Sequence, residues 1–213
     1  MRIFFGATLP DSVKMQIIRI QEELRPSVHD AKFEGKDKLH ITLQFIGDFK
    51  FEKLPELFSS VESALKELSP KWSAVEVVGM NFFPSEKIRR GIWLDCQDDG
   101  TLSRVSETIK SVTAKFGIVP EDRPFKPHIT IARLKDRNVR LSRTHTDERS
   151  VSFRHSDNFG RDRVEDLKKF ESEGKLRFEK FSPVSIALFE SRLNRDKSGS
   201  EYKILSEISA SNA

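Results

Sequence analysis

The tripeptide His-Ile-Thr occurs twice in this chain, at residues 40–42 and 128–130, each time inside a short apolar run. Both runs, residues 39–46 and 127–132, are rich in β-branched and aromatic side chains, which predicts two strands. Side chains two residues apart share one face of a strand, so each His lies beside its Thr while the Ile between them points to the other face. Two His-Thr pairs on two strands indicate a two-histidine site.

The segments before the two tripeptides also correspond to each other. His40 and His128 are 88 residues apart (128 − 40), and this offset aligns the strand-like residues 3–5 with 91–93 and Lys38 with Lys126. A run with apolar residues at helical spacing follows each strand: Val13, Ile17, Ile20 and Leu24 in the first copy, and Leu102, Val105, Ile109 and Val112 in the second. The pattern predicts an internal duplication of strand, helix and strand.

Further segments predict the rest of the fold. Residues 51–68 form an amphipathic helix with Pro55 in its first turn, and residues 72–80 and 89–96 form two strands. Residues 181–189 and 201–208 form a hairpin whose turn is residues 194–199. We therefore expect an α+β protein with two similar lobes over residues 1–213, in which antiparallel sheets line a central cleft and helices lie outside.

One segment departs from this pattern. Between residues 135 and 180 the chain is dense in charge and has little apolar periodicity, which predicts an insertion. Val164, Leu167 and Phe170, followed by Gly174, predict a short helix within it. Two interpretations stay open: a solvated loop, as is usual for long charged segments, or a basic arm that contacts a nucleic-acid backbone.

The composition indicates a globular protein of a reducing compartment. The 213 residues are 37% hydrophobic, which is enough for a sizeable core, and the single cysteine, Cys96, predicts a cytoplasmic location. No apolar run reaches the length of a membrane span or of a signal-peptide core, so we expect no membrane contact. The net charge of +4 is only a weak sign of anionic partners because both signs of charge are mixed. We expect a monomer.

The paired motifs predict a specific chemistry. Imidazole titrates near neutral pH, so one ring can take a proton while the other gives one. The hydroxyls of Thr42 and Thr130 can donate hydrogen bonds to an anion held between the strands. Displacement at phosphorus needs both steps, because the nucleophile loses a proton and the departing oxygen gains one. The arrangement predicts phosphoester chemistry at His40 and His128 without a metal ion.

Other chemistries find little support in the sequence. His29, His145 and His155 lie in polar surroundings, and they do not form the spaced ligand set of a zinc site. The chain has neither a glycine-rich phosphate loop nor a Gly-x-Ser-x-Gly motif. We therefore expect no metal and no cofactor.

The motif strands resemble those of the two-histidine (2H) phosphoesterase superfamily, and their details resemble its RNA 2′,3′-cyclic phosphodiesterase branch, also called 2′,5′ RNA ligase. The matching segments are residues 2–7, 39–47, 125–133 and 190–193, with Gly199 and Tyr202. They span nearly the whole chain, and residues 127–133 are the most specific. The charged insertion is longer than this branch usually carries, which leaves the substrate and the partner open.

The resemblance implies an enzyme that hydrolyses an RNA-terminal 2′,3′-cyclic phosphate to a 2′-phosphate and can also join RNA ends. It implies that RNA ends or cyclic nucleotides are the substrates and that Thr42 and Thr130 hold the phosphate. His128 is assigned as the base and His40 as the acid, although the internal repeat gives little basis for this order. The alternative is a module that binds a nucleotide or an RNA end in the same cleft without turnover.

Two residues near the motifs have open roles. Arg133 matches an arginine of the family motif and can bind phosphate, but strict alternation places it on the face opposite His128. It reaches the site only if the strand ends or bulges near Ala132. Phe45, five residues after His40, is expected to pack in the core rather than against a base. A group of three basic residues forms either a rim that attracts phosphate or a solvated turn: Lys87, Arg89 and Arg90.

Overall fold

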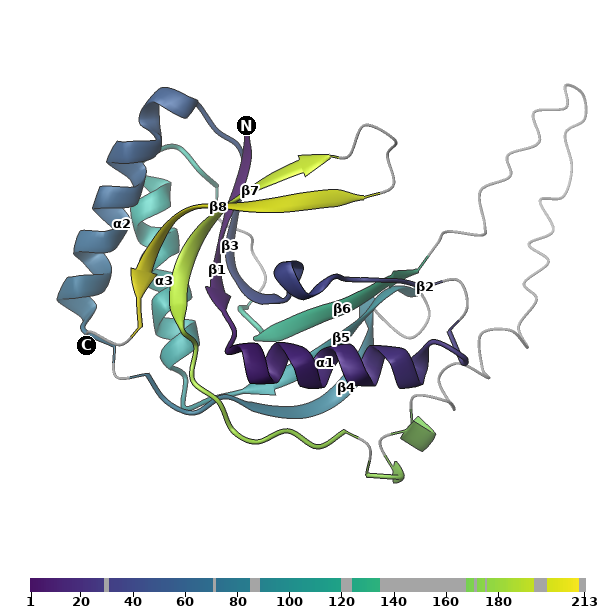
Figure 1. Cartoon of the computed structure of the whole chain (residues 1–213). Coiled ribbons are helices and arrows are strands. Elements are labelled where there is room, and N and C mark those ends of the chain that lie inside the picture. The colour runs from purple at the N-terminus through teal and green to yellow at the C-terminus, as the bar shows by residue number, and fades with distance from the viewer. Residues whose placement is uncertain are drawn as a thin grey trace, which may run out of the picture.

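Figure 1 shows the computed structural model of the chain. The structure describes residues 1–28, 31–70, 72–84, 89–119, 124–134, 168–170, 172–174, 176–193 and 199–210. Most of the predicted insertion lies outside the described residues, and so do His29, Lys87, His145 and His155. Of the short helix predicted there, residues 168–170 are helical, and Phe170 is buried in the hydrophobic core.

Within the described residues, eight strands form one antiparallel sheet, so the predicted α+β class with antiparallel pairing is confirmed. The strand order is β4-β5-β6-β3-β1-β7-β8, and β2 pairs with β6. The strands are β1 (Arg2–Thr8), β2 (Ala31–Phe33), β3 (His40–Asp48), β4 (Glu76–Pro84), β5 (Arg89–Gln97), β6 (His128–Leu134), β7 (Ser185–Leu193) and β8 (Ser200–Ser209).

The helices have the predicted apolar faces. They are α1 (Asp11–Leu24), α2 (Leu54–Leu68) and α3 (Thr101–Ala114), with short 3₁₀ turns at Lys36–Lys38 and Phe51–Lys53. Every apolar residue that defined the two repeated helical patterns is buried in α1 or α3. Pro55 lies in the first turn of α2, where its missing N–H would have no helical partner in any case.

Some strand boundaries differ from the predicted ones. The first predicted strand of the second half begins at Glu76 rather than at residue 72, and β7 begins at Ser185 rather than at residue 181. Phe181 instead forms an isolated antiparallel bridge with Val75, and both side chains are buried. This bridge is not part of β4 or β7. Strand propensity does not distinguish an isolated bridge from a continuous strand, so the predicted starts of β4 and β7 were too early.

The predicted strand-helix-strand repeat is confirmed by the element order β1-α1-β3 and β5-α3-β6, with one correction. Thr8 pairs with His40, and Asp95 pairs with His128. The equivalent positions of β1 and β5 are therefore 87 residues apart (95 − 8), one fewer than the 88 that separate the motifs. The sequence alignment slipped by one here because both strands contain long apolar runs, in which a shift of one residue still matches apolar with apolar.

The expectation of separate sheets is wrong in one respect, because the two halves share a continuous sheet. β3 and β6 pair through the two motif isoleucines, Ile41 and Ile129, and both side chains are fully buried. Burial of these isoleucines in one core leaves the neighbouring His and Thr side chains on the opposite face of the sheet. The apolar residue inside each motif thus brings the two His-x-Thr units together.

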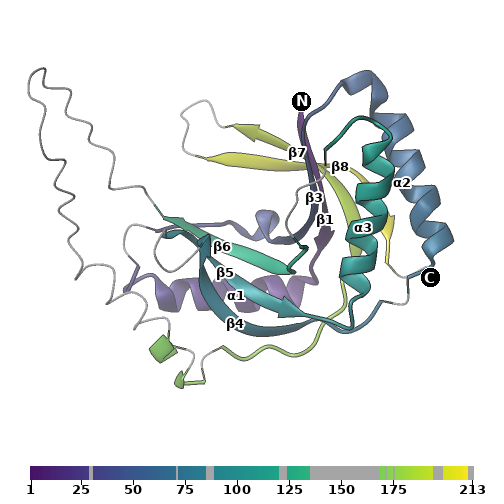
Figure 2. The same ribbon diagram turned by 180° about the vertical axis from the view of Figure 1, so that it is seen from behind.

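Each repeated helix packs on the other half of the sheet. Figures 1 and 2 show α2 and α3 side by side over the half that contains β1 and β3, and α1 over the half that contains β4, β5 and β6. Buried polar contacts confirm this crossing: Ser106 of α3 donates to β3, and Gln21 of α1 donates to β6. The two halves therefore contact each other through their helices as well as through their strands.

Among the described residues, no helix combines the length and the apolar character that crossing a membrane requires. The prediction that residues 1–213 form a single two-lobed domain stays a prediction.

Candidate active site

Each motif strand contains a bulge three residues after its histidine. Gly6 pairs with Thr42 and Phe5 with Gln44, so Leu43 is left out of the pairing with β1. In β6, Trp93 pairs with Thr130 and Ile92 with Ala132, which leaves out Ile131. An extra residue reverses the alternation of the side chains beyond it. The residue five positions after each histidine therefore turns to the face that carries the histidine.

In β6 the bulge brings Arg133 to the site. From the sequence, a role of Arg133 was conditional on such a bulge near Ala132. Arg133 lines the same pocket as His40 and Thr42. Its Nε donates to Oε1 of Glu34 at 2.9 Å, and Nζ of Lys38 lies 2.8 Å from the other oxygen of that carboxylate. Glu34 is only 6% exposed, so this buried carboxylate fixes the position of Arg133 beside the site.

In β3 the bulge places Phe45 at the site, and the expectation that Phe45 lies in the core is wrong. Its side chain is 37% exposed, and it lines both pockets described below. The guanidinium of Arg2 lies 4.9 Å from the centroid of its ring. The sequence pattern gave Phe45 a core position because alternation without a bulge continues the buried face of Ile41 and Leu43.

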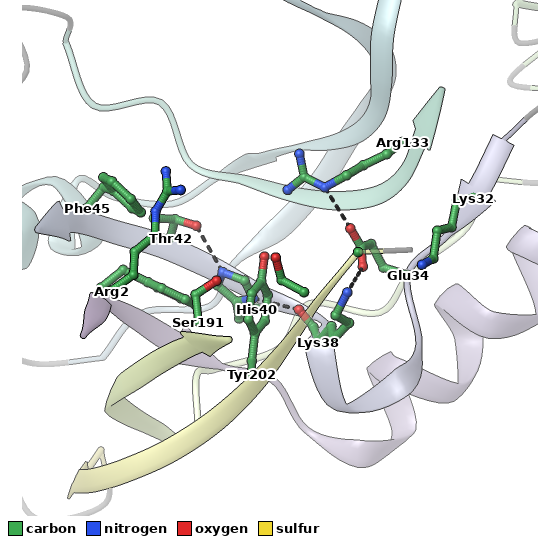
Figure 3. A pocket seen from close by; sticks show the side chains of 13 residues that line it. Arg2, Lys32, Glu34, Lys38, His40, Thr42, Phe45, Arg133, Ser191 and Tyr202 are labelled. Atoms are coloured by element: carbon green, nitrogen blue, oxygen red, sulfur yellow. Dashed lines mark hydrogen bonds and ion pairs between the residues drawn. The ribbon is translucent and has the colours of Figure 1, made fainter. Parts of the chain in front are cut away.

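Two adjacent pockets contain four of the five predicted site residues. The first, with a volume of about 380 Å³, is drawn in Figure 3 and contains His40, Thr42 and Arg133. The second, of about 350 Å³, contains His128. Thr42 and Phe45 line both pockets and thus connect them. Thr130 is half-buried and pairs with Trp93, but it lines neither of these two pockets.

Basic side chains dominate the first pocket. Arg2, Lys32, Lys38 and Arg133 all line it, with Glu34 as the acidic residue among them. The Glu34 carboxylate bridges Lys38 and Arg133, whereas no carboxylate of the described residues forms an ion pair with Arg2 or Lys32. The pocket therefore carries excess positive charge and is suited to an anion.

The same backbone contact fixes the tautomer of both histidines. Nδ1 of His40 donates to the carbonyl oxygen of Lys38 at 2.6 Å, and Nδ1 of His128 donates to that of Lys126 at 2.9 Å. A carbonyl oxygen only accepts hydrogen bonds, so Nδ1 carries the proton and Nε2 of the neutral ring is free to accept. For His40, the Thr42 hydroxyl lies 2.9 Å from Nε2 and donates to it. Both rings can therefore act as proton acceptors through Nε2.

Aromatic rings enclose His40. The centroids of Phe4, Phe189 and Tyr202 lie 4.9, 5.3 and 5.5 Å from the centroid of the His40 ring. Burial lowers the pKa of His40 to about 4 from 6.5, although the hydrogen bond to the Lys38 carbonyl acts in the opposite direction. His40 is therefore neutral at neutral pH.

His128 has a different environment. The Trp93 ring lies 4.4 Å from the His128 ring, centroid to centroid, and burial lowers the pKa of His128. The Lys126 carbonyl and the negative charge of Asp95 act in the opposite direction and raise this pKa. Asp95 is itself buried, accepts a hydrogen bond from Asn81, and forms an ion pair with Lys126 at 2.9 Å. The Asp95 carboxylate favours protonation of His128. The equivalent position beside His40 is occupied by Thr8, which carries a hydroxyl instead of a carboxylate.

A second pair of equivalent positions differs even more in size. Gly6 pairs with Thr42, whereas Trp93 pairs with Thr130. A Cβ atom at Gly6 would lie 3.0 Å from Cδ2 of His40 and 3.2 Å from the carbonyl oxygen of Ile41. The glycine is therefore required for the close approach of the His40 ring, while an indole fills the equivalent place beside His128.

The sequence reasoning missed several residues of the site. Glu34 lies in a short segment between two lysines that carries no motif, so its burial was not visible. Asp95 was hidden by the one-residue slip in the alignment, which placed Thr8 opposite Cys96. A corrected offset of 87 would have identified both Asp95 and Trp93 as neighbours of the second motif.

No three His, Cys, Asp or Glu side chains of the described residues are grouped so that they could hold a metal ion. The polar groups of the site are instead two imidazoles, hydroxyls and cationic side chains. This set can bind an anion and move protons to and from it.

Comparison with known proteins places these features in a family. A family model described as the 2′-5′ RNA ligase superfamily matches residues 9–159. An RNA 2′,3′-cyclic phosphodiesterase of Archaeoglobus fulgidus is 29% identical over 142 residues, which cover 67% of this chain and 77% of that protein. One of Thermus thermophilus is 32% identical over 141 residues, which cover 63% of this chain and 69% of that protein.

Solved structures share the fold along almost the whole chain. The crystal structure of the protein TT0787 of Thermus thermophilus superposes with a TM-score of 0.68 at 23% identity, covering 98% of this chain and 97% of the other. That of E. coli LigT complexed with 3′-AMP gives a TM-score of 0.64 at 19% identity, with the same coverage of both chains.

Proposed function

Because the chain belongs to the 2′-5′ RNA ligase superfamily, we propose that it is an RNA 2′,3′-cyclic phosphodiesterase that hydrolyses a terminal cyclic phosphate to a 2′-phosphate. Curated relatives are RNA 2′,3′-cyclic phosphodiesterases, which agrees with the proposed substrate class. The observation that carries the proposal is the pair of His-x-Thr units, joined at Ile41 and Ile129 and each with Nδ1 fixed by a backbone carbonyl. A module that only binds has no need for two such proton acceptors.

The phosphate is held by the basic and hydroxyl groups around the rings. When the phosphate binds, the Thr42 hydroxyl turns from Nε2 of His40 and donates to one of its oxygens, and the Thr130 hydroxyl donates to another. The guanidinium of Arg133 provides a charge-assisted contact. Glu34 orients this guanidinium through Nε, so the terminal nitrogens of Arg133 are left for the substrate.

We propose that His40 takes the proton from the attacking water and that His128 gives a proton to the departing 3′ oxygen. Water forms the new bond to phosphorus, and the bond from phosphorus to the 3′ oxygen breaks. This order is the reverse of the one assigned from the sequence. It is supported by the enclosure of His40, which lowers its pKa to about 4 and keeps the ring unprotonated, and by Asp95, whose negative charge opposes the lowering of the His128 pKa by burial.

The same site supports reversible ligation, because attack by a ribose hydroxyl in place of water would join two RNA ends. The proposal uses no metal and no cofactor. RNA ends or cyclic nucleotides as substrates, a monomeric state and a cytoplasmic location stay predictions.

The test is hydrolysis of an RNA oligonucleotide that ends in a 2′,3′-cyclic phosphate, with and without a chelator. We expect a 2′-phosphate product in both conditions, and we expect His40→Ala and His128→Ala to lose roughly 10²- to 10⁴-fold in rate. Lys115→Gln, an exposed position away from both pockets, serves as the control. Tight binding of the oligonucleotide without product would support the binding module instead, and loss of activity with chelator would indicate a metal-dependent reaction.

A further inference from the structure

We propose that Lys38 and Lys126 are positioning residues for the two histidines. Each lysine anchors the segment that enters its motif strand, so that its carbonyl oxygen stays in place to accept Nδ1–H of the histidine two residues later. The two lysines occupy equivalent positions of the repeat, 88 residues apart (126 − 38). The consequence for catalysis rests on the proposed function, whereas the effect on the histidine tautomer does not.

The first support is a buried carboxylate that anchors each lysine side chain. Nζ of Lys38 lies 2.8 Å from Oε2 of Glu34, and Nζ of Lys126 lies 2.9 Å from Oδ1 of Asp95. The two carboxylates are 6% and 7% exposed. Solvent screens a pair with a buried partner much less than a surface pair, so each carboxylate restrains its lysine.

The two carboxylates are not equivalent in the repeat. Glu34 directly follows β2 and lies four residues before Lys38, whereas Asp95 is on β5 and pairs with His128 across the strands. The duplication accounts for the matching lysines, but it does not account for two carboxylates that come from different elements. That both lysines are nevertheless anchored in the same way favours a common role of the two lysines at the site.

The second support is an aromatic ring that contacts the lysine and the histidine in each copy. Nζ of Lys38 lies 5.1 Å from the centroid of the Tyr202 ring, which is 5.5 Å from the centroid of the His40 ring. In the second copy Trp93 takes this place, 5.5 Å from Nζ of the lysine and 4.4 Å from the histidine ring. A cation is attracted to the face of an aromatic ring, so each lysine also restrains the ring that packs on the imidazole.

The carbonyl oxygen of the lysine links this anchor to the chemistry. Figure 3 shows Lys38 with its ammonium on Glu34 and its carbonyl oxygen on Nδ1 of His40. If the carbonyl is displaced, Nδ1–H loses its acceptor and the proton of the neutral ring is no longer held on that nitrogen. A neutral ring with its proton on Nε2 cannot accept a second proton at the atom that the mechanism uses. The lysine anchor therefore preserves the reactive tautomer.

The first test determines the tautomers by NMR. Proton–nitrogen correlation spectra of isotope-labelled protein, recorded above the ordinary histidine pKa of about 6.5, identify the ring nitrogen that carries the proton. Spectra of His40→Gln and His128→Gln assign the signals. We expect Lys38→Met to increase the Nε2–H form at His40 alone, and Lys126→Met to increase it at His128 alone. Arginine at either lysine position keeps the charge and is expected to keep the Nδ1–H form.

The methionine variants are designed to fold, because each carboxylate keeps a second partner. Glu34 keeps its ion pair with Arg133, and Asp95 keeps its hydrogen bond from Asn81. Lys66→Met, which removes an exposed lysine of α2 that also forms an ion pair, is the matched control and is expected to leave both tautomers unchanged. Thermal unfolding of each variant identifies loss of fold.

The anchor itself is tested by coupling. Asp95→Asn weakens the ion pair and keeps the shape of the side chain. We expect it to change the tautomer of His128 in the same direction as Lys126→Met, and the double variant to change it little further. Additive changes in the double variant would show that the two side chains act separately, and this would overturn the anchor.

Kinetics with the cyclic-phosphate oligonucleotide separate positioning from substrate binding. We expect Lys38→Met and Lys126→Met to lower kcat by roughly 10- to 100-fold with little change in KM, which is the range for removing a group that orients a metal-bound histidine. A higher KM with wild-type kcat would show that the lysines bind the substrate instead, and it would overturn the positioning role.

The outcomes keep this proposal separate from the proposed function. A folded Lys126→Met protein in which His128 keeps Nδ1–H would contradict the positioning role, whatever its activity. If the tautomers change as expected but the wild-type protein does not hydrolyse the oligonucleotide, the positioning role stands and the proposed function fails.

Discussion

At the scale of single residues, the two histidines are alike in sequence and different in environment. The same backbone contact fixes both rings, yet three aromatic rings enclose His40 while a carboxylate and an indole lie beside His128. The pKa of each ring is therefore set by the residues around it rather than by the motif. Two measurements at this scale follow from the difference.

The first concerns stability against pH. The His40 pKa is about 4 in the folded protein and near 6.5 in the unfolded chain, so between these values the unfolded chain binds more protons. We expect the free energy of unfolding to fall as the pH decreases from about 6.5 to 4, and His40→Gln to lose less over this window. Urea unfolding of both proteins across the window measures the difference. An equal loss in both would show that His40 does not titrate as described.

The second concerns the roles of the rings. A cyclic phosphate with sulfur in place of the 3′ oxygen has a leaving group that needs little protonation. We expect this substrate to restore activity to His128→Ala, which lacks the proposed acid, and to leave His40→Ala slow, because this variant lacks the proposed base. The ratio of rates for the sulfur and oxygen substrates in each variant is the measurement. Rescue of His40→Ala alone would return the roles to the order assigned from the sequence.

At the scale of elements, buried polar side chains stabilise both bulges. Ser106 donates to the bulge of β3, and in the second copy Gln21 of α1 donates to the carbonyl oxygens of Ile131 and Glu34, each at 2.9 Å. Glu34 then positions Arg133 through its carboxylate. A helix of one copy thus controls the shape of the motif strand in the other.

Replacing this contact tests its importance. Gln21→Met keeps the length of the side chain but removes the donor from two buried carbonyls, one of which, that of Ile131, keeps a bond from the Glu34 N–H. We expect a loss of about 1–3 kcal/mol in the free energy of unfolding. Urea unfolding beside Gln16→Met, a half-buried position on the same helix, measures it. A loss no larger than that of the control would indicate that the bulge needs no donor from α1.

The sequence predicted the repeated elements and the motif residues but not the bulges. Periodicity identifies a strand such as β6 because Ile129 and Ile131 are apolar, and it then extrapolates the alternation to Arg133. A bulge breaks this extrapolation at one residue, and its stabilising donor lies far away along the chain. For this reason the role of Arg133 at the site depended on an unpredicted bulge, and Phe45 was assigned to the wrong face of β3, although both motifs were found.

At the scale of the whole molecule, the two halves depend on each other. α1 follows β1 but packs on β6, and α3 follows β5 but packs on β3. Ile41 and Ile129 join the two parts of the sheet in a shared core. Each half therefore buries part of its apolar face beneath a helix of the other half.

This dependence predicts a single unfolding transition for the two halves. We expect the calorimetric enthalpy of unfolding to equal the van't Hoff enthalpy for the main transition. Ile41→Ala, which removes a fully buried side chain at the junction, should lower the free energy of unfolding by about 2–5 kcal/mol without splitting the transition. Two separate transitions, in the wild-type protein or in the variant, would show that the halves fold independently.

The exchange of Gly6 for Trp93 between equivalent positions has a consequence for the isomer of the product. A cleft with true two-fold symmetry would accept a cyclic phosphate in two poses related by a half turn, and it would break the bond to the 2′ or the 3′ oxygen with equal ease. The indole fills space on one side that the glycine leaves to the His40 ring on the other. If the chain has the proposed function, we expect only one pose to match the cleft. The choice of the bond that breaks would then follow from the departure of the fold from its own internal symmetry.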